Sequence, residues 1–254
     1  MTTNSSDLTS GGSSDGAFSA QPTTADQRLL ASWDANAAAW TTAVREQRIP
    51  SRRAGTDAAI VQACLRTSAA TVLDVGCGEG WLARALAHAG RDVVGIDASA
   101  GLVEQAANMA LANDTSGGSA HFLAVGYQEL IADEVQLRGP WELIVCNFAL
   151  LGDPLAPLLS ALTRRLAPQG RVLIQTVHPW LAMGDGSYAN TWREENFQGF
   201  GVAFPSTMPW YFRTLGSWIE QLTAAGLSVR TVNEPAHPET GRPLSLLLEC
   251  ALSP

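Results

Sequence analysis

The residues best suited to bind a ligand form a glycine-rich loop near residue 76. The loop joins a run of β-type residues to an amphipathic helical segment, and it contains Asp74, Gly76, Cys77, Gly78 and Gly80. Glycine lets the backbone take positive φ and approach a ligand closely, and the free amides at a helix N-terminus favour anionic groups. The loop alone therefore indicates a nucleotide-like ligand.

The spacing of this loop differs from the dinucleotide-binding fingerprint. That fingerprint is G-x-G-x-x-G, with the third glycine under a pyrophosphate. Here the pattern is D-x-G-x-G-x-G, and a carboxylate at Asp74 repels a pyrophosphate but suits a ligand that carries an ammonium group. The next β-type run ends in Asp97, where a carboxylate can accept both hydroxyls of a ribose. An NAD-type oxidoreductase is disfavoured by this spacing and stays open as an alternative.

His178 is the first candidate for a general base. It follows the fifth predicted strand, and an imidazole gains and loses its proton near neutral pH. The alternative is a structural corner, in which the histidine of His-Pro-Trp bonds a backbone carbonyl. Glu194 and Glu195 are further candidates, with an exposed acidic pair as their alternative. The four cysteines are far apart and form no C-x-x-C pair, so we expect neither a metal nor a disulfide.

Short β-type runs alternate with helical segments after residue 70, which is typical of a parallel sheet with helices on both faces. The predicted strands are Thr71–Val75, Asp92–Asp97, Ala120–Val125, Trp141–Asn147 and Gly170–Val177. The predicted helices between them are Gly80–Ala89, Ser99–Ala112, Gln128–Gln136 and Pro154–Leu166. Runs such as LIVC and VLIQTV are almost continuously apolar, as expected of strands covered on both faces.

The β/α alternation is interrupted between residues 178 and 212, where nine of the eighteen aromatic residues lie. We interpret this aromatic-rich segment as an insertion. A helix near Thr214–Gly226 follows, and strands near Leu227–Val232 and Leu244–Ala251 are predicted to form an antiparallel hairpin. The predicted fold class is α/β: a Rossmann-like, doubly wound, mostly parallel sheet of seven strands with an antiparallel last strand.

The amino-terminal part is predicted to contain a tail and a helical cap. Residues 1–26 have few apolar side chains, so we expect a disordered tail. Residues 27–254 then form one domain. Its segment 27–70 is the cap, in which one helix carries Trp33 and Trp40 on the same face and a second covers Gly55–Arg66.

Charge and composition exclude several classes of partner. The net charge of −8 gives no electrostatic reason to bind nucleic acid. The sequence has no apolar run long enough to span a membrane and no signal-peptide pattern at its start, so a cytoplasmic location is expected.

The two motifs VLDVGCGEG and VVGIDAS, in this order, resemble the first two motifs of class I S-adenosylmethionine-dependent methyltransferases. The resemblance continues through CNFALL, which ends the fourth strand, and through RLAPQGRVLIQTVHPW around the fifth. It is strongest to the bacterial small-molecule methyltransferases, whose first helix often carries a pattern similar to WDANAAAW at residues 33–40. The resemblance implies S-adenosylmethionine as the cofactor.

The resemblance also assigns roles to individual residues. It places the loop Gly76–Gly80 against the methionine part of the cofactor, Asp74 near its ammonium and Asp97 on the ribose hydroxyls. Among Arg45, Arg48, Arg52 and Arg53, it favours Arg53 as the cation that meets the cofactor's carboxylate, with a solvated surface arginine as the alternative.

Further roles concern the adenine and the sulfonium. Gly126 stands where the family has an acidic residue near the adenine, so Tyr127 and Gln128 are the expected substitutes, and an ordinary core position is the alternative for Tyr127. Asn147 and Phe148 are expected on the sulfonium side. Trp40 and Ala98 complete the expected cofactor site.

The function implied is methyl transfer from S-adenosylmethionine to oxygen, nitrogen or carbon of a small organic acceptor. The insertion is expected to wall an apolar acceptor pocket, with a core of its own or a homodimer contact as alternatives. A non-catalytic cofactor-binding protein of the same fold is the alternative function.

Overall fold

The computed structural model describes residues 24–109, 117–135, 137 and 139–254. Most of the predicted tail, residues 1–23, lies outside this part of the chain. Its last three residues belong to helix α1 (Thr24–Arg45), so the boundary predicted after residue 26 is corrected by three residues. Trp33 and Trp40 do share one face of α1, with their ring centroids 5.1 Å apart.

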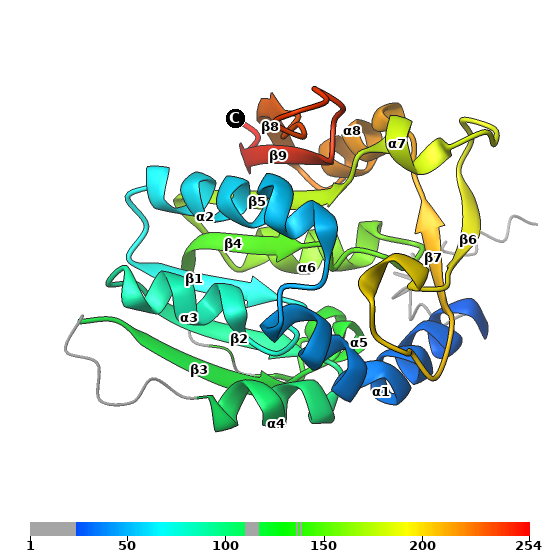
Figure 1. Cartoon of the computed structure of the whole chain (residues 1–254). Helices are drawn as coiled ribbons and strands as arrows, with labels where there is room; N and C mark the ends of the chain where they lie inside the picture. The colour runs from blue at the N-terminus through cyan, green and yellow to red at the C-terminus, as the bar shows by residue number, and fades with distance from the viewer. Residues whose placement is uncertain (1–23, 110–116, 136, 138) are drawn as a thin grey trace, which may run out of the picture.

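Seven strands form one sheet in the order β3-β2-β1-β4-β5-β9-β8 (Figure 1). Strands β1 to β5 run parallel, and β9 is antiparallel to both of its neighbours, β5 and β8. The predicted fold class and the final antiparallel hairpin are confirmed. The strands are β1 (Thr71–Val75), β2 (Asp92–Asp97), β3 (Ser119–Ala124), β4 (Trp141–Asn147), β5 (Leu166–Val177), β8 (Leu227–Asn233) and β9 (Ser245–Leu252).

Helices cover both faces of the sheet because its central strands are apolar on both sides. In Figure 1, α2 (Asp57–Arg66) and α3 (Trp81–His88) lie in front of the sheet, and their apolar residues share one core with alternate residues of β1 and β4. The opposite core contains the other strand residues and the helices α5 (Tyr127–Ala132), α6 (Ala156–Arg164) and α8 (Leu215–Ala224). Helix α4 (Ala100–Asn108) packs against β3 and α1.

Three element ends differ from the prediction by four residues, which is more than the other ends do. Helix α5 ends at Ala132 instead of Gln136, since Asp133 takes a left-handed conformation with φ 60°. Strand β5 begins at Leu166 instead of Gly170, because Leu166 pairs with Trp141 ahead of a register shift. Helix α4 ends at Asn108, and residues 110–112 of the predicted helix lie outside the described residues.

The aromatic-rich insertion contains a short helix, α7 (Pro179–Met183), a 3-10 turn, η2 (Gln198–Phe200), and a two-stranded antiparallel sheet of β6 (Thr191–Glu195) and β7 (Met208–Phe212). It packs on α1 in a small core that includes Leu29, Phe197 and Met208. Within it the rings of Phe197 and Phe204 stack with centroids 4.2 Å apart. The insertion therefore has a core, which it shares with the cap helix.

Candidate functional site

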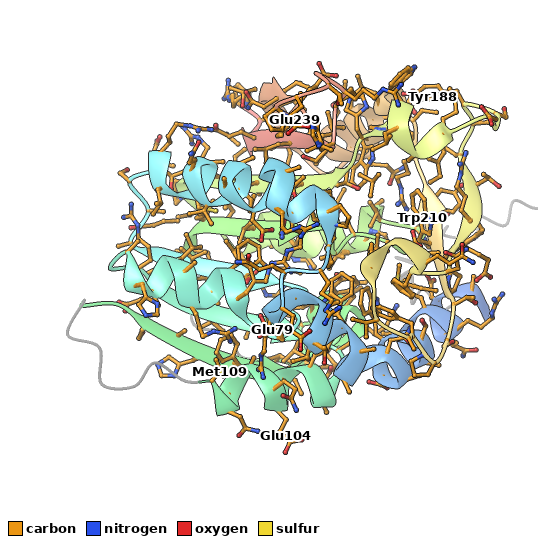
Figure 2. The ribbon with its side chains drawn as sticks, in the orientation of Figure 1. Glu79, Glu104, Met109, Tyr188, Trp210 and Glu239 are labelled. Carbon is orange, nitrogen blue, oxygen red and sulfur yellow. The ribbon has the colours of Figure 1, made fainter. Side chains whose placement is uncertain are left out.

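A cavity of about 450 Å³ lies at the carboxyl ends of β1, β4 and β5. The cap helix and the insertion enclose it from the other side. Figure 2 shows Trp210 on β7 and Glu79 near α1. Six of the predicted site residues line this cavity: Trp40, Gly76, Cys77, Gly78, Asn147 and Phe148.

The glycine loop forms the part of the cavity wall that is nearest to the sheet. The amides of Gly76 and Cys77 donate to the carbonyl of Ile96 at 2.8 and 2.9 Å, which fixes the loop over the end of β2. Gly78 has φ +57°, and a Cβ there would have only Trp40 Nε1 nearby, at 3.5 Å. Gly80 has φ +83°, and a Cβ there would lie 2.6 Å from the ring of Phe122. The missing side chain of Gly78 therefore leaves space in the cavity, whereas that of Gly80 leaves space for the ring of Phe122 to pack.

Asp97 lies beside the loop rather than on the cavity wall. Its Oδ2 accepts from the amide of Gly78 and its Oδ1 from that of Ser99, both at 2.9 Å. Burial raises the pKa of Asp97, and the two backbone bonds oppose that effect. The neighbouring Ala98 is exposed and is also absent from the wall.

Asp74 lies beneath the loop and is only 1% exposed. Burial, and next the charge of Asp97, raise the pKa of Asp74 to about 7, while a hydrogen bond from the backbone of Ala83 opposes the rise. Asp74 is not part of the cavity wall. Strand β1 directs this carboxylate beneath the loop, and its expected contact with a ligand ammonium stays a prediction.

On the loop side of the cavity the wall includes an acidic residue, Glu79, which the sequence interpretation missed. It is 1% exposed, and its Oε2 accepts from Arg45 Nε at 3.0 Å and from an Nη of Arg84 at 2.7 Å. The signal available in the sequence was a charged side chain between two glycines of the loop, Gly78 and Gly80.

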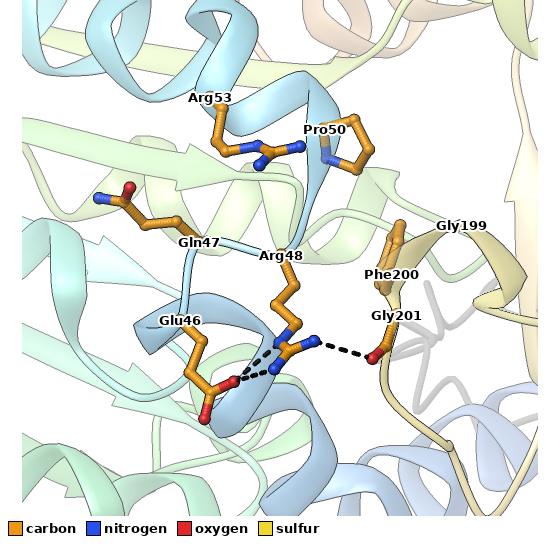
Figure 3. A pocket seen from close by; sticks show the side chains of 8 residues that line it. All are labelled: Glu46, Gln47, Arg48, Pro50, Arg53, Gly199, Phe200 and Gly201. Carbon is orange, nitrogen blue, oxygen red and sulfur yellow. Dashed lines mark hydrogen bonds and ion pairs between the residues drawn. The ribbon is translucent and has the colours of Figure 1, made fainter.

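Of the neighbouring arginines Arg52 and Arg53, only Arg52 reaches the cavity. Its Nε bonds Asp57 at 2.8 Å, and its guanidinium lies 4.4 Å from the ring centroid of Trp81. Arg53, the residue favoured from the sequence, is exposed and lines a separate surface pocket of about 390 Å³ beside Phe200 (Figure 3). The expectation for Arg53 is corrected, because the turn η1 (Arg52–Thr56) directs the two neighbours to different pockets.

Tyr127 and Gln128 are absent from the cavity wall. The hydroxyl of Tyr127 donates to the carbonyl of Ala149 at 3.0 Å, and the ring packs against the core under α5 and α6. Burial raises the pKa of Tyr127 well above its usual value. Gln128 is exposed. This geometry matches the alternative for Tyr127, an ordinary core position, and gives neither residue a contact with the cavity.

Asn147 and Phe148 are held rigidly at the end of β4. Asn147 Oδ1 accepts from Gln175 Nε2 at 2.9 Å, and the same Nε2 donates to the carbonyl of Thr56 at 3.0 Å. Phe148 has φ +54°, and its amide donates to the carbonyl of Gln175 at 2.7 Å. Gln175 thus joins β4, β5 and η1 next to the cavity.

His178 does not line the cavity and is 8% exposed. Its Nδ1 accepts from the amide of Trp180 at 3.2 Å, which caps α7, and its Nε2 lies 2.8 Å from Oε1 of Glu234. Both ring nitrogens are therefore engaged away from the cavity. The arrangement is a corner in which His178 bonds a backbone amide rather than the carbonyl expected, and the role of His178 as a base stays a prediction.

The side of the cavity formed by the insertion carries three aromatic rings and two carboxylates. The rings are those of Phe197, Phe200 and Trp210. Glu194 is ion-paired with Arg28, and Oε1 of Glu195 accepts from the amide of Phe197 at 2.7 Å.

Two kinds of feature are absent from the described part of the chain. None of its helices combines the length and apolarity that a membrane crossing requires. Within the same residues, His, Cys, Asp and Glu form no group of three that could hold a metal ion.

A family model described as a methyltransferase domain matches residues 46–232. The ubiquinone biosynthesis O-methyltransferase of Xylella fastidiosa (strain 9a5c) is 34% identical over 117 residues, which is 45% of each chain. The corresponding enzyme of Pseudomonas paraeruginosa (strain DSM 24068 / PA7) is 32% identical over 112 residues, 42% of this chain and 44% of the other. The chain therefore spans about half the length of the curated relatives it matches.

Solved structures share the fold. The DhpI-SAM-HEP complex superposes with a TM-score of 0.62 and 20% identity, covering 89% of this chain and 97% of that chain. An S-adenosylmethionine-dependent methyltransferase from Mesorhizobium loti gives a TM-score of 0.54 at 20% identity, covering 75% of this chain and 95% of the other.

Proposed function

Since the chain belongs to the methyltransferase domain family, we propose that it transfers a methyl group from S-adenosylmethionine to a small organic acceptor. The observation that carries this proposal is the cavity itself. Its inner side is the glycine loop at the carboxyl end of β1, and its outer side is the aromatic insertion. Ligands of doubly wound sheets bind at this edge.

The residues of the inner side fit the cofactor. Gly78 leaves the backbone open to it, and Trp40 offers an indole N–H and a ring face beside that glycine. Arg52, which is 12% exposed and already oriented by Asp57, is the cation placed to meet the cofactor's carboxylate. Asp97 would hold the ribose hydroxyls through the remaining lone pairs of its oxygens.

The cofactor supplies an electrophilic methyl group on a sulfonium, and the reaction is an in-line displacement. The protein therefore contributes mainly position and exclusion of water. Asn147 and Phe148, fixed by Gln175, define one side of the cavity, and the rings of the insertion define the opposite side. The cavity extends between these two sides, which favours an enzyme over a binding protein whose acceptor space is filled.

A hydroxyl acceptor needs a base, whereas a neutral amine or a carboxylate does not. Glu195 is the side chain we place in that role, because it lines the acceptor side and Glu194 is paired with Arg28. The acceptor is a small molecule rather than a nucleic acid, since the chain carries a net charge of −8. A cytoplasmic location is supported by four free, buried cysteines.

The test is a transfer assay with methyl-labelled S-adenosylmethionine and a panel of small aromatic phenols, amines and carboxylates. We expect label in at least one class of acceptor. With a phenol, Glu195→Gln should lower turnover roughly 10²- to 10⁴-fold, while Glu194→Gln should change it much less. Binding of the cofactor without transfer to any acceptor would contradict the proposal and favour the non-catalytic alternative.

A further inference from the structure

Glu79 is a buried carboxylate with one engaged oxygen and one free oxygen. Its Oε2 accepts from Arg45 on α1 and from Arg84 on α3. Its Oε1 is fully buried and accepts no hydrogen bond from the residues that the structure describes. Glu79 also lines the cavity.

A buried carboxylate oxygen without a donor is unfavourable, and native proteins usually supply a partner for such a group. Both guanidinium groups bond the other oxygen, so they do not satisfy Oε1. The ion pairs fix the carboxylate in one orientation. The position therefore suits a hydrogen-bond donor that arrives with a ligand, and a cationic donor most of all.

The location of Glu79 indicates which part of the ligand supplies that donor. Glu79 lies between Gly78 and Gly80 on the loop. The carboxylate of Asp97 accepts a hydrogen bond from the amide of the same Gly78. If Asp97 meets the ribose, the next part of S-adenosylmethionine along the loop is its methionyl group, which carries an ammonium. Asp74 also has a buried oxygen, Oδ2, that accepts no hydrogen bond from the described residues, but Asp74 lies beneath the loop, whereas Glu79 is part of the cavity wall.

We propose that Glu79 accepts a hydrogen bond from the ammonium of the cofactor's methionyl group. This inference rests on the proposed function, and the contact expected of Asp74 is its alternative. Because Arg45 of α1 holds the same carboxylate, the cap helix positions Glu79 for this contact.

The test compares two ligands by titration calorimetry. S-Adenosylhomocysteine has the methionyl-type ammonium, and 5′-methylthioadenosine lacks the whole amino-acid end. Glu79→Gln should weaken S-adenosylhomocysteine roughly 10- to 100-fold, the range expected for a hydrogen bond to a charged group. The same variant should bind 5′-methylthioadenosine like the wild type.

Two further variants separate this role from a structural one. Glu104→Gln changes an exposed carboxylate on α4 and should bind both ligands normally (Figure 2). Arg45→Met removes one of the two ion pairs that orient the carboxylate but keeps the acceptor, so it should weaken S-adenosylhomocysteine less than Glu79→Gln does and leave 5′-methylthioadenosine unchanged.

Two results of the Glu79→Gln titrations would overturn the inference. One is unchanged affinity for S-adenosylhomocysteine, and the other is an equal loss for both ligands, which would show a purely structural role. A wild-type chain that binds neither ligand would instead contradict the proposed function, and this inference with it.

Discussion

Asp97 and Gly78 are joined by a hydrogen bond of 2.9 Å from the glycine amide to Oδ2 of the carboxylate. The bond connects the end of β2 to the loop that follows β1. A second bond, from the amide of Ser99 to Oδ1, leaves the carboxylate with a fixed orientation.

Asp97→Ala should weaken binding of S-adenosylhomocysteine by about 1–3 kcal/mol, because two ribose hydroxyls lose their acceptor. Calorimetry measures this change. Asp92→Ala, at the opposite and exposed end of β2, is the matched control and should bind normally. Wild-type affinity in Asp97→Ala would refute the assignment.

Substitutions at Gly78 and Gly80 should have different effects on ligand binding and on thermal stability. Gly78→Val places a branched side chain next to Trp40 in the cavity, so it should abolish ligand binding. Its positive φ adds a strain of about 1–2 kcal/mol, and the fold should survive. Gly80→Val also overlaps the ring of Phe122, so it should melt at a clearly lower temperature than Gly78→Val. Equal melting temperatures would contradict this division of roles.

Asp74 should make the stability of the protein depend on pH. Its pKa is raised from 3.8 to about 7 in the folded state, so the folded chain keeps a proton that the unfolded chain has lost between these values. The contribution of protonated Asp74 to the free energy of unfolding is therefore fully present below about pH 4, and it is lost as the pH rises through 7.

Asp74→Asn removes this titration. Relative to the wild type, the variant should gain on the order of 4 kcal/mol in its free energy of unfolding between pH 4 and pH 8. Urea unfolding of both proteins at several pH values measures the difference. A difference that stays constant with pH would show that Asp74 does not titrate in this range.

His178→Ala should lower stability without touching catalysis. The variant loses the cap of α7 and the contact with Glu234, which together contribute about 1–2 kcal/mol. The rate of methyl transfer by the folded variant should stay near that of the wild type. A loss of kcat of roughly 10²-fold or more with an unchanged melting temperature would restore His178 as the base.

The sheet was predictable because its apolar runs and the β/α alternation are local patterns. β1, β2 and β4 have the predicted bounds. The ends of α5 and β5 were missed because they depend on tertiary pairing or on one left-handed residue, Asp133. The hairpin of β6 and β7 was missed because its side chains pack against α1, far away in the sequence.

The site was predictable to the extent that backbone positions define it. Gly76, Gly78 and the end of β4 line the cavity, whereas Gly80 packs against Phe122. Side-chain direction was not predictable from the motif: Asp74 points into the core, while Glu79 reaches the cavity. The choice between Arg52 and Arg53 depended on the turn η1, which no local pattern indicated.

Titration of S-adenosylmethionine, S-adenosylhomocysteine and NAD into the wild-type protein and into Gly78→Val tests the central claim most directly. The account predicts that the two adenosyl ligands bind the wild type at one site per chain, that NAD does not bind, and that Gly78→Val binds none of them. Binding of NAD, or failure of the wild type to bind either adenosyl ligand, would contradict it.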